Sequence, residues 1–391
     1  MNNVIIKDKE FIANTYARFP IQIVKGKGSY LYDSDDNEYI DMGTGIAVNT
    51  FGACDEKWIE AVSYQLNCIS HTSNLYYTSP CVELAEMLTS KTGMKKVFFS
   101  NSGAEANECA IKVARKYAQE KKGAEYSTIV TLKNSFHGRT LTTLSATGQD
   151  HYHELYNPLT PGFEHFEADN FYELVALAGH TKIAGIMIEC VQGEGGVNVL
   201  SYDFVQQIYN FCKEHDVLLI VDEVQTGNGR TGKLYGYMNY DIVPDIITTA
   251  KGLGGGLPIG ATILGEKVKD VLSFGDHGST FGGNPVACAG AISILNRLDD
   301  ELFKDVNEKS EYIFSSLKDA DGVLSVSGKG LMIGIETVKP CKEVLDYCLK
   351  NGVLVLTAKN KIRLLPALNI PMDALQKAIK IIKDGCKTNS N

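Results

Sequence analysis

The chain has 391 residues, of which 44% are hydrophobic and 22% are charged, and its formal net charge is −9. This composition is typical of a soluble globular protein whose core is large enough for two or three domains. The negative charge argues against a nucleic-acid partner, because binding to a phosphate backbone requires clustered positive charge.

The N-terminal stretch MNNVIIKDKEF has neither a long apolar core nor an Arg-rich amphipathic pattern. It resembles no targeting segment, so we expect a cytoplasmic location. The ten cysteines are spread along the chain without CxxC pairs or Cys/His clusters of metal-site spacing. We therefore expect free thiols and no metal site.

The middle of the chain alternates short apolar runs with helical patterns, whereas the first fifty residues contain only the strand-like stretch SYLYDSDDNEYIDM. The alternation predicts an α/β fold with a mostly parallel sheet and helices on both faces. The predicted strands are Val97–Ser100, Thr128–Leu132, Ile183–Ile188, Val217–Val221, Ile246–Thr249 and Ala261–Leu264.

From about residue 297 the pattern changes to the helix DDELFKDVNEKSEYIFSSLKDA, the strand GLMIGIE and the terminal helix MDALQKAIKIIKDG. We predict that residues 57–296 form a large domain. Residues 1–56 and 297–391 are expected to form a smaller α+β domain from both chain ends.

Ser102, Gly103 and Ala104 follow the first predicted strand and open an amphipathic helix. The unpaired N–H groups and the dipole at such a helix start favour an anion, for example a phosphate. Ser102 and Glu105 also match a capping box, which alone would explain both residues. The predicted apolar face comprises Ala106, Cys109, Ala110, Val113, Ala114 and Tyr117.

Arg139, in KNSFHGRTLTTLSATGQD, is the only obligate charge between Lys133 and Asp150. A guanidinium among small neutral residues suits bidentate capture of a carboxylate, and a structural ion pair is the competing interpretation. Phe136 either packs in the core or stacks on a flat ligand.

Asp222 ends a buried apolar run in LLIVDEVQTGNGRTGKL. It is either a turn cap or a fixed carboxylate in the crevice beyond the strand ends, where it could keep a pyridine nitrogen protonated. The following stretch Gly227–Lys233 imitates a phosphate loop. Leu234 stands where that loop needs Ser or Thr for magnesium, which argues against nucleotide hydrolysis.

Lys251 is the single charge between Asp245 and Glu266, in DIITTAKGLGGGLPIGATILGEK. A lone lysine is usually a solvated surface residue. In apolar surroundings, however, its pKa falls and the free amine can attack an aldehyde. The glycines do not form a dinucleotide fingerprint, because Leu257 occupies the third glycine position.

A phosphate site, an aldehyde-reactive lysine and a pyridinium-pairing aspartate together suit pyridoxal 5'-phosphate. The chain also resembles the class III pyridoxal-phosphate-dependent aminotransferases almost from end to end. The resemblance is carried by YARFPI, HTSNLYY, SGAEANE, NSFHGRT, QGEGG, DEVQTGNGRTGK, AKGLGGGLPIGA, HGSTFGGNP and RLLPAL.

The resemblance implies pyridoxal-phosphate transferase fold type I and a role for each cofactor contact. Lys251 is implied to bond to the cofactor and move the substrate proton, and Asp222 to pair with the ring nitrogen. Phe136 and Val224 would enclose the ring, and Gln225 would approach its phenolic oxygen. The phosphate would be held by Ser102, Gly103 and Ala104 and by the partner subunit's Thr280, so a homodimer with shared active sites is implied.

The implied reaction moves the terminal amine of N2-acetyl-L-ornithine to 2-oxoglutarate, a step of arginine biosynthesis that gives N-acetyl-L-glutamate 5-semialdehyde and L-glutamate. Arg139 would anchor the distant carboxylate of both substrates. Arg363 would bind the α-carboxylate of glutamate, and Glu194 would neutralise Arg363 when the other substrate is bound. Tyr16 and Ser279 complete the implied substrate contacts.

Succinylornithine, ornithine and 4-aminobutyrate remain alternative donors. Departures from the family pattern at Ala53–Glu56, Cys190 and Ala367 remove no catalytic group, although they could change loops near the donor pocket. A different class, a cofactor-binding regulator without turnover, is disfavoured by the intact Lys251, Asp222 and Arg139.

Overall fold

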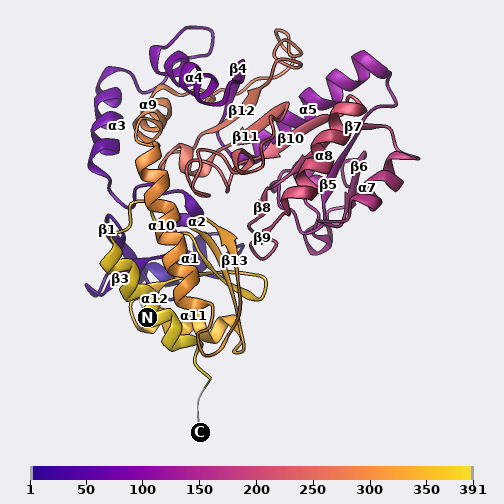
Figure 1. Ribbon diagram of the computed structural model, residues 1–391. Coiled ribbons are helices and arrows are strands. Elements are labelled where there is room, and N and C mark those ends of the chain that lie inside the picture. Colours follow the sequence, from indigo (N-terminus) through magenta and orange to yellow (C-terminus); the bar gives the residue numbers. More distant parts are fainter. Residues whose placement is uncertain (1–2, 389–391) are drawn as a thin grey trace.

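The largest element of the computed structural model, which describes residues 3–388, is a seven-stranded sheet (Figure 1). Its strand order is β4-β12-β11-β10-β7-β5-β6. Only β12 runs antiparallel to its neighbours, so the prediction of a mostly parallel sheet is confirmed. The strands are β4 (Lys96–Ser100), β5 (Thr128–Leu132), β6 (Phe163–Phe166), β7 (Ile183–Ile188), β10 (Leu218–Asp222), β11 (Ile246–Thr249) and β12 (Gly260–Leu264).

The predicted apolar runs coincide with six of these strands to within one residue at each end. The edge strand β6 is not among them, because its sequence FEHF mixes polar and apolar residues and only its last residue is buried. A strand with apolar side chains on both of its faces is covered by other elements on both faces. Every residue of β7 and β10 is buried in this way.

Helix α5 (Gly103–Lys122) covers one face of this sheet, and α8 (Tyr202–Glu214) covers the other. The predicted apolar stripe of α5 is buried, and it packs on Leu218 and Ile220 of β10. The alternate residues Leu219 and Val221 face the opposite core, which contains Phe204 and Ile208 of α8. The two-residue period of the strand thus divides the core into two layers.

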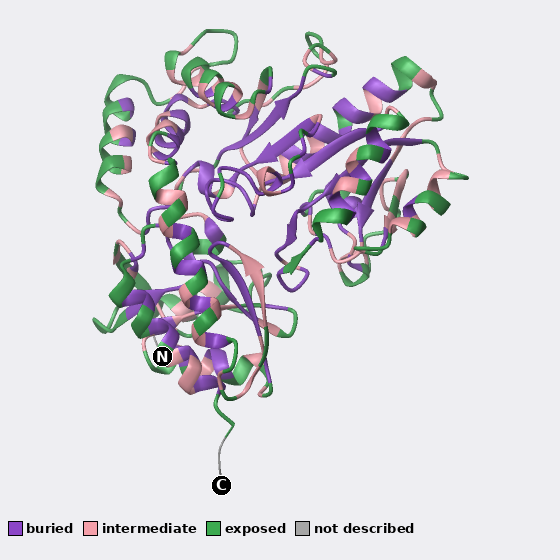
Figure 2. Cartoon of the chain, in the orientation of Figure 1, coloured by how far each residue is buried: buried purple, intermediate pink, exposed green. Residues whose placement is uncertain are grey.

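The remaining helices of this part lie around the sheet. Helix α9 packs against both α3 and α4, and α4 also contacts β4 (Figure 1). Their outer surfaces are exposed, whereas the central strands are buried (Figure 2). The helices are α3 (Glu56–Cys68), α4 (Ser79–Thr92), α6 (Leu141–Ala146), α7 (Phe171–Ala178) and α9 (Pro285–Leu295), with 3-10 turns η1 (Asp150–Tyr152), η2 (Gly236–Asn239) and η3 (Lys251–Leu253).

The two ends of the chain come together in a second region, at the bottom of Figure 1. One sheet there has the order β1-β2-β3-β15, in which β15 pairs in parallel with β3, so the sequence ends share backbone hydrogen bonds. Its strands are β1 (Ile23–Lys27), β2 (Tyr30–Asp33), β3 (Glu38–Asp41) and β15 (Val353–Leu354). The exact division at residues 57 and 297 stays a prediction.

A second four-stranded sheet of this region is antiparallel and has the order β13-β14-β17-β16. It comprises β13 (Val323–Lys329), β14 (Met332–Thr337), β16 (Leu356–Ala358) and β17 (Lys361–Leu364). The helices are α1 (Asn3–Phe11), α10 (Asp300–Leu317), α11 (Cys341–Lys350) and α12 (Met372–Cys386), while α2 (Thr44–Ala47) is a short turn with positive φ throughout. A small hairpin consists of β8 (Val191–Gln192) and β9 (Asn198–Val199).

Among residues 3–388, no helix combines the length and apolar character needed to cross a membrane.

Candidate active site

A cavity of about 250 Å³ lies where the parallel strands of the large sheet end. Its walls come from the segments that follow β5, β7, β10 and β11 and from the start of α5. In doubly wound α/β folds this edge is where ligands bind, because the loops there diverge. The lining residues are Gly103, Ala104, Asn107, Phe136, His137, Gly138, Arg139, Glu189, Asp222, Val224, Gln225 and Lys251.

Asp222 is buried at the end of β10, and three donors hold its carboxylate. Asn107 Nδ2 and His137 Nδ1 each donate to Oδ2 over 2.8 Å, and the backbone N–H of Val224 donates to Oδ1 over 3.0 Å. These three donors fix the direction of the carboxylate. The turn-cap interpretation and the ligand interpretation of Asp222 are both compatible with this geometry.

Asn107 and His137 are site residues that the sequence reasoning missed. Asn107 lies on the buried side of α5, and its Oδ1 accepts from Thr248 Oγ1 over 2.7 Å. Nε2 of His137 is buried and has no hydrogen-bond partner among the described residues. One available signal was a lone amide on an otherwise apolar helix stripe, since a buried amide needs partners.

Lys251 lies in η3, directly after β11, and its φ of 43° is unusual for a residue with a Cβ. The turn is held in place because Thr50 Oγ1 donates to Gly252 O over 2.8 Å and Asn228 Nδ2 donates to Ala250 O over 3.2 Å. Burial lowers the pKa of Lys251, while the carboxylate of Asp222 acts in the opposite direction. Lys251 also lines the cavity and is only partly exposed, which argues against a solvated surface lysine.

The start of α5 has the form of an anion cradle. Ser102 is the N-cap, and its Oγ accepts from the backbone N–H of Glu105 over 3.2 Å. No protein acceptor for the N–H groups of Gly103 and Ala104 is found in the described part of the chain. A Cβ on Gly103 would lie 2.7 Å from Cγ1 of Val224, so glycine lets the helix start approach the loop after β10.

The predicted capping box at this helix is corrected in one detail. The Glu105 carboxylate accepts from the backbone N–H of Asn101 over 3.0 Å and from Ser102 Oγ over 2.9 Å, and not from the backbone N–H of Ser102. Glu105 therefore fixes Asn101, the residue before the cap.

Phe136 and Val224 line the same cavity as Lys251 and Asp222. The backbone N–H of Phe136 donates to Oε2 of Glu189 over 2.9 Å. Glu189 is a further residue that the sequence reasoning missed, and its burial beside Asp222 raises its pKa well above the ordinary value. A buried carboxyl group that stays neutral avoids a second negative charge next to Asp222.

Arg363 and Glu194 form an ion pair next to the cavity. Nη1 of Arg363 donates to Oε1 of Glu194 over 2.5 Å and to Oε1 of Gln225 over 3.2 Å. Arg363 is buried on β17, and the Glu194 side chain is 24% exposed. Since Gln225 also lines the cavity, this pair borders the predicted cofactor site.

Arg139 is exposed, and its guanidinium carbon lies 4.2 Å from the ring centre of Tyr152 and 5.5 Å from that of Phe136. No ion pair of Arg139 occurs in the described part of the chain, so the competing ion-pair interpretation finds no support there.

Besides Ser102, Glu194 and Arg363, three further predicted site residues do not line the cavity of this one chain. Tyr16 is 70% exposed and borders a separate hollow at the N-terminal segment. Ser279 and Thr280 lie in the loop before α9, where Ser279 Oγ accepts from Asn101 Nδ2 over 3.1 Å. Thr280 is exposed.

The stretch that imitates a phosphate loop has a structural role. Residues 225–232 are buried and lead into a 3-10 turn, whereas a phosphate loop leads into an α-helix. Arg230 Nη1 donates to Leu331 O over 3.1 Å and to Pro366 O over 2.5 Å. The loop thus fastens the large sheet to the region that carries β14 and β17, and the rejection of nucleotide chemistry is supported.

The class-III aminotransferase family model matches residues 11–385. The chain is 48% identical over 377 residues to the acetylornithine aminotransferase of Haemophilus ducreyi, and the match covers 96% of both chains. The acetylornithine aminotransferase structure from Elizabethkingia anophelis superposes with a TM-score of 0.87 at 32% identity and 98% coverage of both chains.

A Toxoplasma gondii ornithine aminotransferase structure, which has partial occupancy of PLP at its active site, gives a TM-score of 0.93. Its sequence identity is 31%, and the superposition covers 98% of this chain and 93% of that one.

Proposed function

The chain belongs to the class-III aminotransferase family, and from that premise we propose that it transfers the terminal amino group of N2-acetyl-L-ornithine to 2-oxoglutarate. The products are N-acetyl-L-glutamate 5-semialdehyde and L-glutamate. The observation that carries this proposal is the short ion pair between Arg363 and Glu194, together with an Arg139 on the cavity wall that has no carboxylate partner among the described residues. In such a site Arg139 can bind a carboxylate of either substrate, whereas Arg363 can bind one only when Glu194 moves away.

We propose pyridoxal 5'-phosphate as the cofactor, and the cavity fits it in three respects. The N–H groups at the start of α5 suit its phosphate, Asp222 suits its ring nitrogen, and Lys251 suits its aldehyde. When bound, this group supplies a carbonyl carbon that carries the amine and a ring that withdraws electrons from the reacting carbon.

Lys251 is the proposed catalytic base. Because burial lowers the pKa of Lys251, its Nζ is more readily free of a proton and able to take one from the substrate carbon. The same Nζ would then deliver that proton to the cofactor carbon that carries the amine. The carboxylate of Asp222 holds a proton at the ring nitrogen, and the donors from Asn107 and His137 keep this carboxylate aimed at the cavity.

The two substrates pose different demands on the arginines. Acetylornithine presents a terminal amine with its carboxylate far away, so Arg139 is the proposed anchor and Glu194 keeps Arg363 neutralised. Glutamate has a second carboxylate next to its amine. This group displaces Glu194 from Arg363, and the freed Glu194, which is partly exposed, turns toward solvent.

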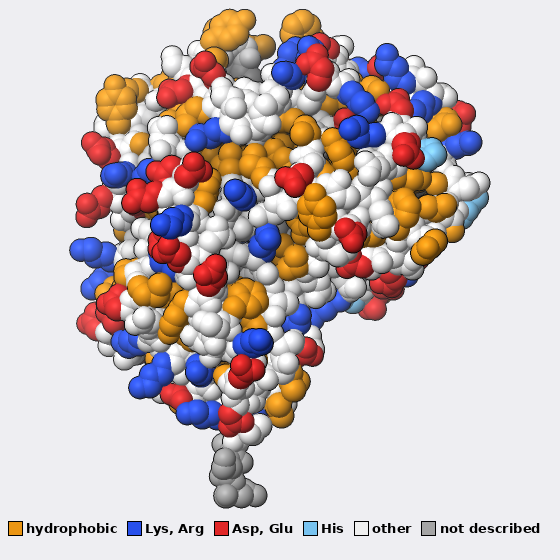
Figure 3. Space-filling view, viewed as in Figure 1, with side chains coloured by type: hydrophobic (Ala, Val, Ile, Leu, Met, Phe, Trp, Pro, Cys, Tyr) orange, Lys and Arg blue, Asp and Glu red, His pale blue; other side chains and the backbone are white. Residues whose placement is uncertain are grey.

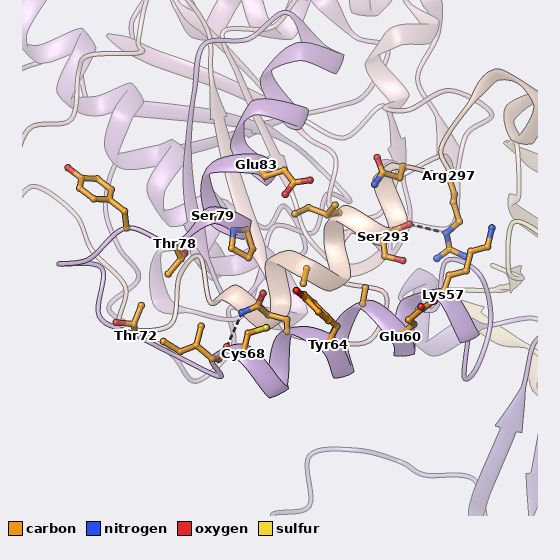
Figure 4. A pocket seen from close by; sticks show the side chains of 18 of the residues that line it. Lys57, Glu60, Tyr64, Cys68, Thr72, Thr78, Ser79, Glu83, Ser293 and Arg297 are labelled. Atoms are coloured by element: carbon orange, nitrogen blue, oxygen red, sulfur yellow. Dashed lines mark hydrogen bonds between the residues drawn. The ribbon is translucent and has the colours of Figure 1, made fainter.

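We also propose a cytoplasmic homodimer with shared sites. Apolar side chains stand exposed over α3, α4 and the loop before α9, at the top and upper left of Figure 3. A groove of about 1100 Å³ lies between α3, α4 and α9, with Tyr64 and Cys68 on one wall and Ser293 and Arg297 on another (Figure 4). Exposed apolar surface of this extent is typical of a protein interface. The partner subunit's Thr280 would then reach the phosphate cradle.

A donor panel tests the proposed reaction. Purified protein loaded with the cofactor is supplied with 2-oxoglutarate and with acetylornithine, succinylornithine, ornithine or 4-aminobutyrate, and glutamate formation is followed. We expect the highest kcat/KM with acetylornithine. A higher value with 4-aminobutyrate would overturn the substrate assignment, and absence of turnover with every donor would favour the regulator alternative.

A further inference from the structure

The two arginines of the site are held in opposite ways. Arg363 is buried and paired with the carboxylate of Glu194 over 2.5 Å. Arg139 is exposed and contacts the rings of Tyr152 and Phe136. Within the described chain a carboxylate near this turn, Glu108, accepts from Thr140 Oγ1 over 2.5 Å and makes no ion pair with Arg139.

An aromatic ring and a carboxylate restrain a guanidinium differently. The ring attracts the cation through its face and leaves the N–H edge free, so the five donors stay available for a bidentate ligand. A carboxylate occupies that edge and must be displaced by every incoming substrate. Arg139, proposed to anchor a carboxylate in both half-reactions, has the restraint that requires no displacement.

Tyr152 is itself fixed by the loop that carries it. Its backbone N–H donates to Gln149 O over 3.0 Å, and Gln149 Nε2 donates to Ser135 O over 2.9 Å. Gly148 N–H donates to Ser135 Oγ over 3.0 Å. The loop is therefore strapped to the segment that carries Phe136, and the rings of Tyr152 and Phe136 meet edge to face with centres 5.7 Å apart.

We propose that Tyr152 is a positioning residue for substrate recognition, which orients Arg139 for the carboxylate shared by the amino donor and the dicarboxylate acceptor. The ring reduces the number of rotamers that Arg139 explores before substrate arrives, so less entropy is lost on binding. The proposal rests on the proposed function, in which Arg139 binds this carboxylate. It concerns substrate affinity and leaves the proton transfer at Lys251 unchanged.

The test compares Tyr152→Leu with Tyr152→Phe in cofactor-loaded protein, with Tyr156→Leu as control. Tyr156 is exposed in the same loop and makes no ring contact within the described chain. KM is measured for acetylornithine and 2-oxoglutarate, and the dissociation constant is measured for glutarate, a dicarboxylate without a reactive amine or ketone. Tyr152→Met replaces Tyr152→Leu if that variant does not fold.

We expect Tyr152→Leu to raise all three constants by roughly 3- to 10-fold, with kcat within about two-fold of the parent. Tyr152→Phe keeps the ring and should behave like the parent, as should Tyr156→Leu. A lower kcat with unchanged KM would overturn the proposal, and so would a Tyr152→Phe variant as impaired as Tyr152→Leu. If acetylornithine is not turned over at all, the glutarate measurement still decides the role of Tyr152.

Discussion

At the scale of single residues, the proposed role of Glu194 is to control which carboxylates bind to Arg363. Its Oε1 accepts a hydrogen bond from Nη1 of Arg363 over 2.5 Å and another from Gln225 Nε2 over 3.4 Å. A charge-assisted hydrogen bond of this kind contributes about 1.5–3 kcal/mol. In the proposed scheme the α-carboxylate of glutamate must compete with that bond for Arg363, whereas the carboxylate of acetylornithine binds Arg139 instead.

We predict that Glu194→Ala lowers KM for glutamate by roughly ten-fold, because Arg363 loses its internal competitor. The efficiency with acetylornithine should fall, since an uncompensated guanidinium is left beside the donor. Both half-reactions can be followed separately from the absorbance of the cofactor. Glu154→Ala, at an exposed position, is the control, and an unchanged preference between the two donors would contradict the switch.

A second prediction concerns Lys251 in protein freed of cofactor. Burial lowers the pKa of Lys251 below the ordinary value of 10.5. Between the lowered value and 10.5 the unfolded chain binds more protons than the folded one, so stability increases with pH across that window. Lys251→Met should therefore unfold at higher urea concentration than the parent at pH 7.

The advantage of Lys251→Met should shrink as the pH approaches 10.5, because both states of the parent then lose the proton. Urea titrations at several pH values measure this, with the exposed Lys233→Met as control. Parallel curves for Lys251→Met and the parent at every pH would mean that the lysine is solvated.

Among the structural elements, the start of α5 shows how close packing creates a binding surface. Gly103 stands against Val224, and Ala104 lies near Gly138, where an added Cβ would come within 2.8 Å of the Ala104 Cβ. The helix start can thus lie between the loops after β5 and β10 only with small residues at these points. The N–H groups then face the cavity instead of a side chain.

We predict that Gly103→Ala lowers stability by about 1–3 kcal/mol, the usual cost of overpacking. The new Cβ would meet Cγ1 of Val224 at 2.7 Å and push α5 away from the loop. The affinity for pyridoxal 5'-phosphate, measured by equilibrium dialysis, should fall with it. Adding Val224→Ala removes the clash and should restore stability, so a double variant no more stable than Gly103→Ala would exclude this explanation.

For the whole molecule, one group of large exposed apolar side chains lies on and beside α3 and α4. Leu75 is 87% exposed, Tyr77 is 98% exposed and Tyr64 is 72% exposed, all on or beside α3 and α4. We predict that Tyr77→Asp weakens the proposed dimer, since a buried unpaired charge is costly at an interface.

The mass measured by light scattering should then shift toward the monomer, and activity should fall with it, because the proposed contact of the partner subunit's Thr280 with the phosphate would be lost. Tyr172→Asp, on α7 and 87% exposed, is the matched control. A dimeric Tyr77→Asp variant with full activity would show that the interface lies elsewhere.

Much of the fold could be predicted from the sequence, because local patterns report on local structure. The apolar runs gave β5, β7 and β11 with their observed bounds, since strands buried on both faces admit few polar residues. The edge strand β6 was not predicted, because its partly exposed residues do not form a continuous apolar run. Lys251 and Arg139 could be identified because each is the single charge in an apolar or neutral stretch, and Asp222 because it ends an apolar run.

Only the tertiary structure decided which side chains support these residues. Asn107, His137 and Thr248 come from α5, the loop after β5 and β11, and they meet around Asp222 because the sheet brings those segments together. Tyr152 likewise reaches Arg139 from a separate loop. The spacing of residues along the chain sets periodicity and caps, but a hydrogen bond between distant segments depends on the packing of the whole sheet, which no single stretch encodes.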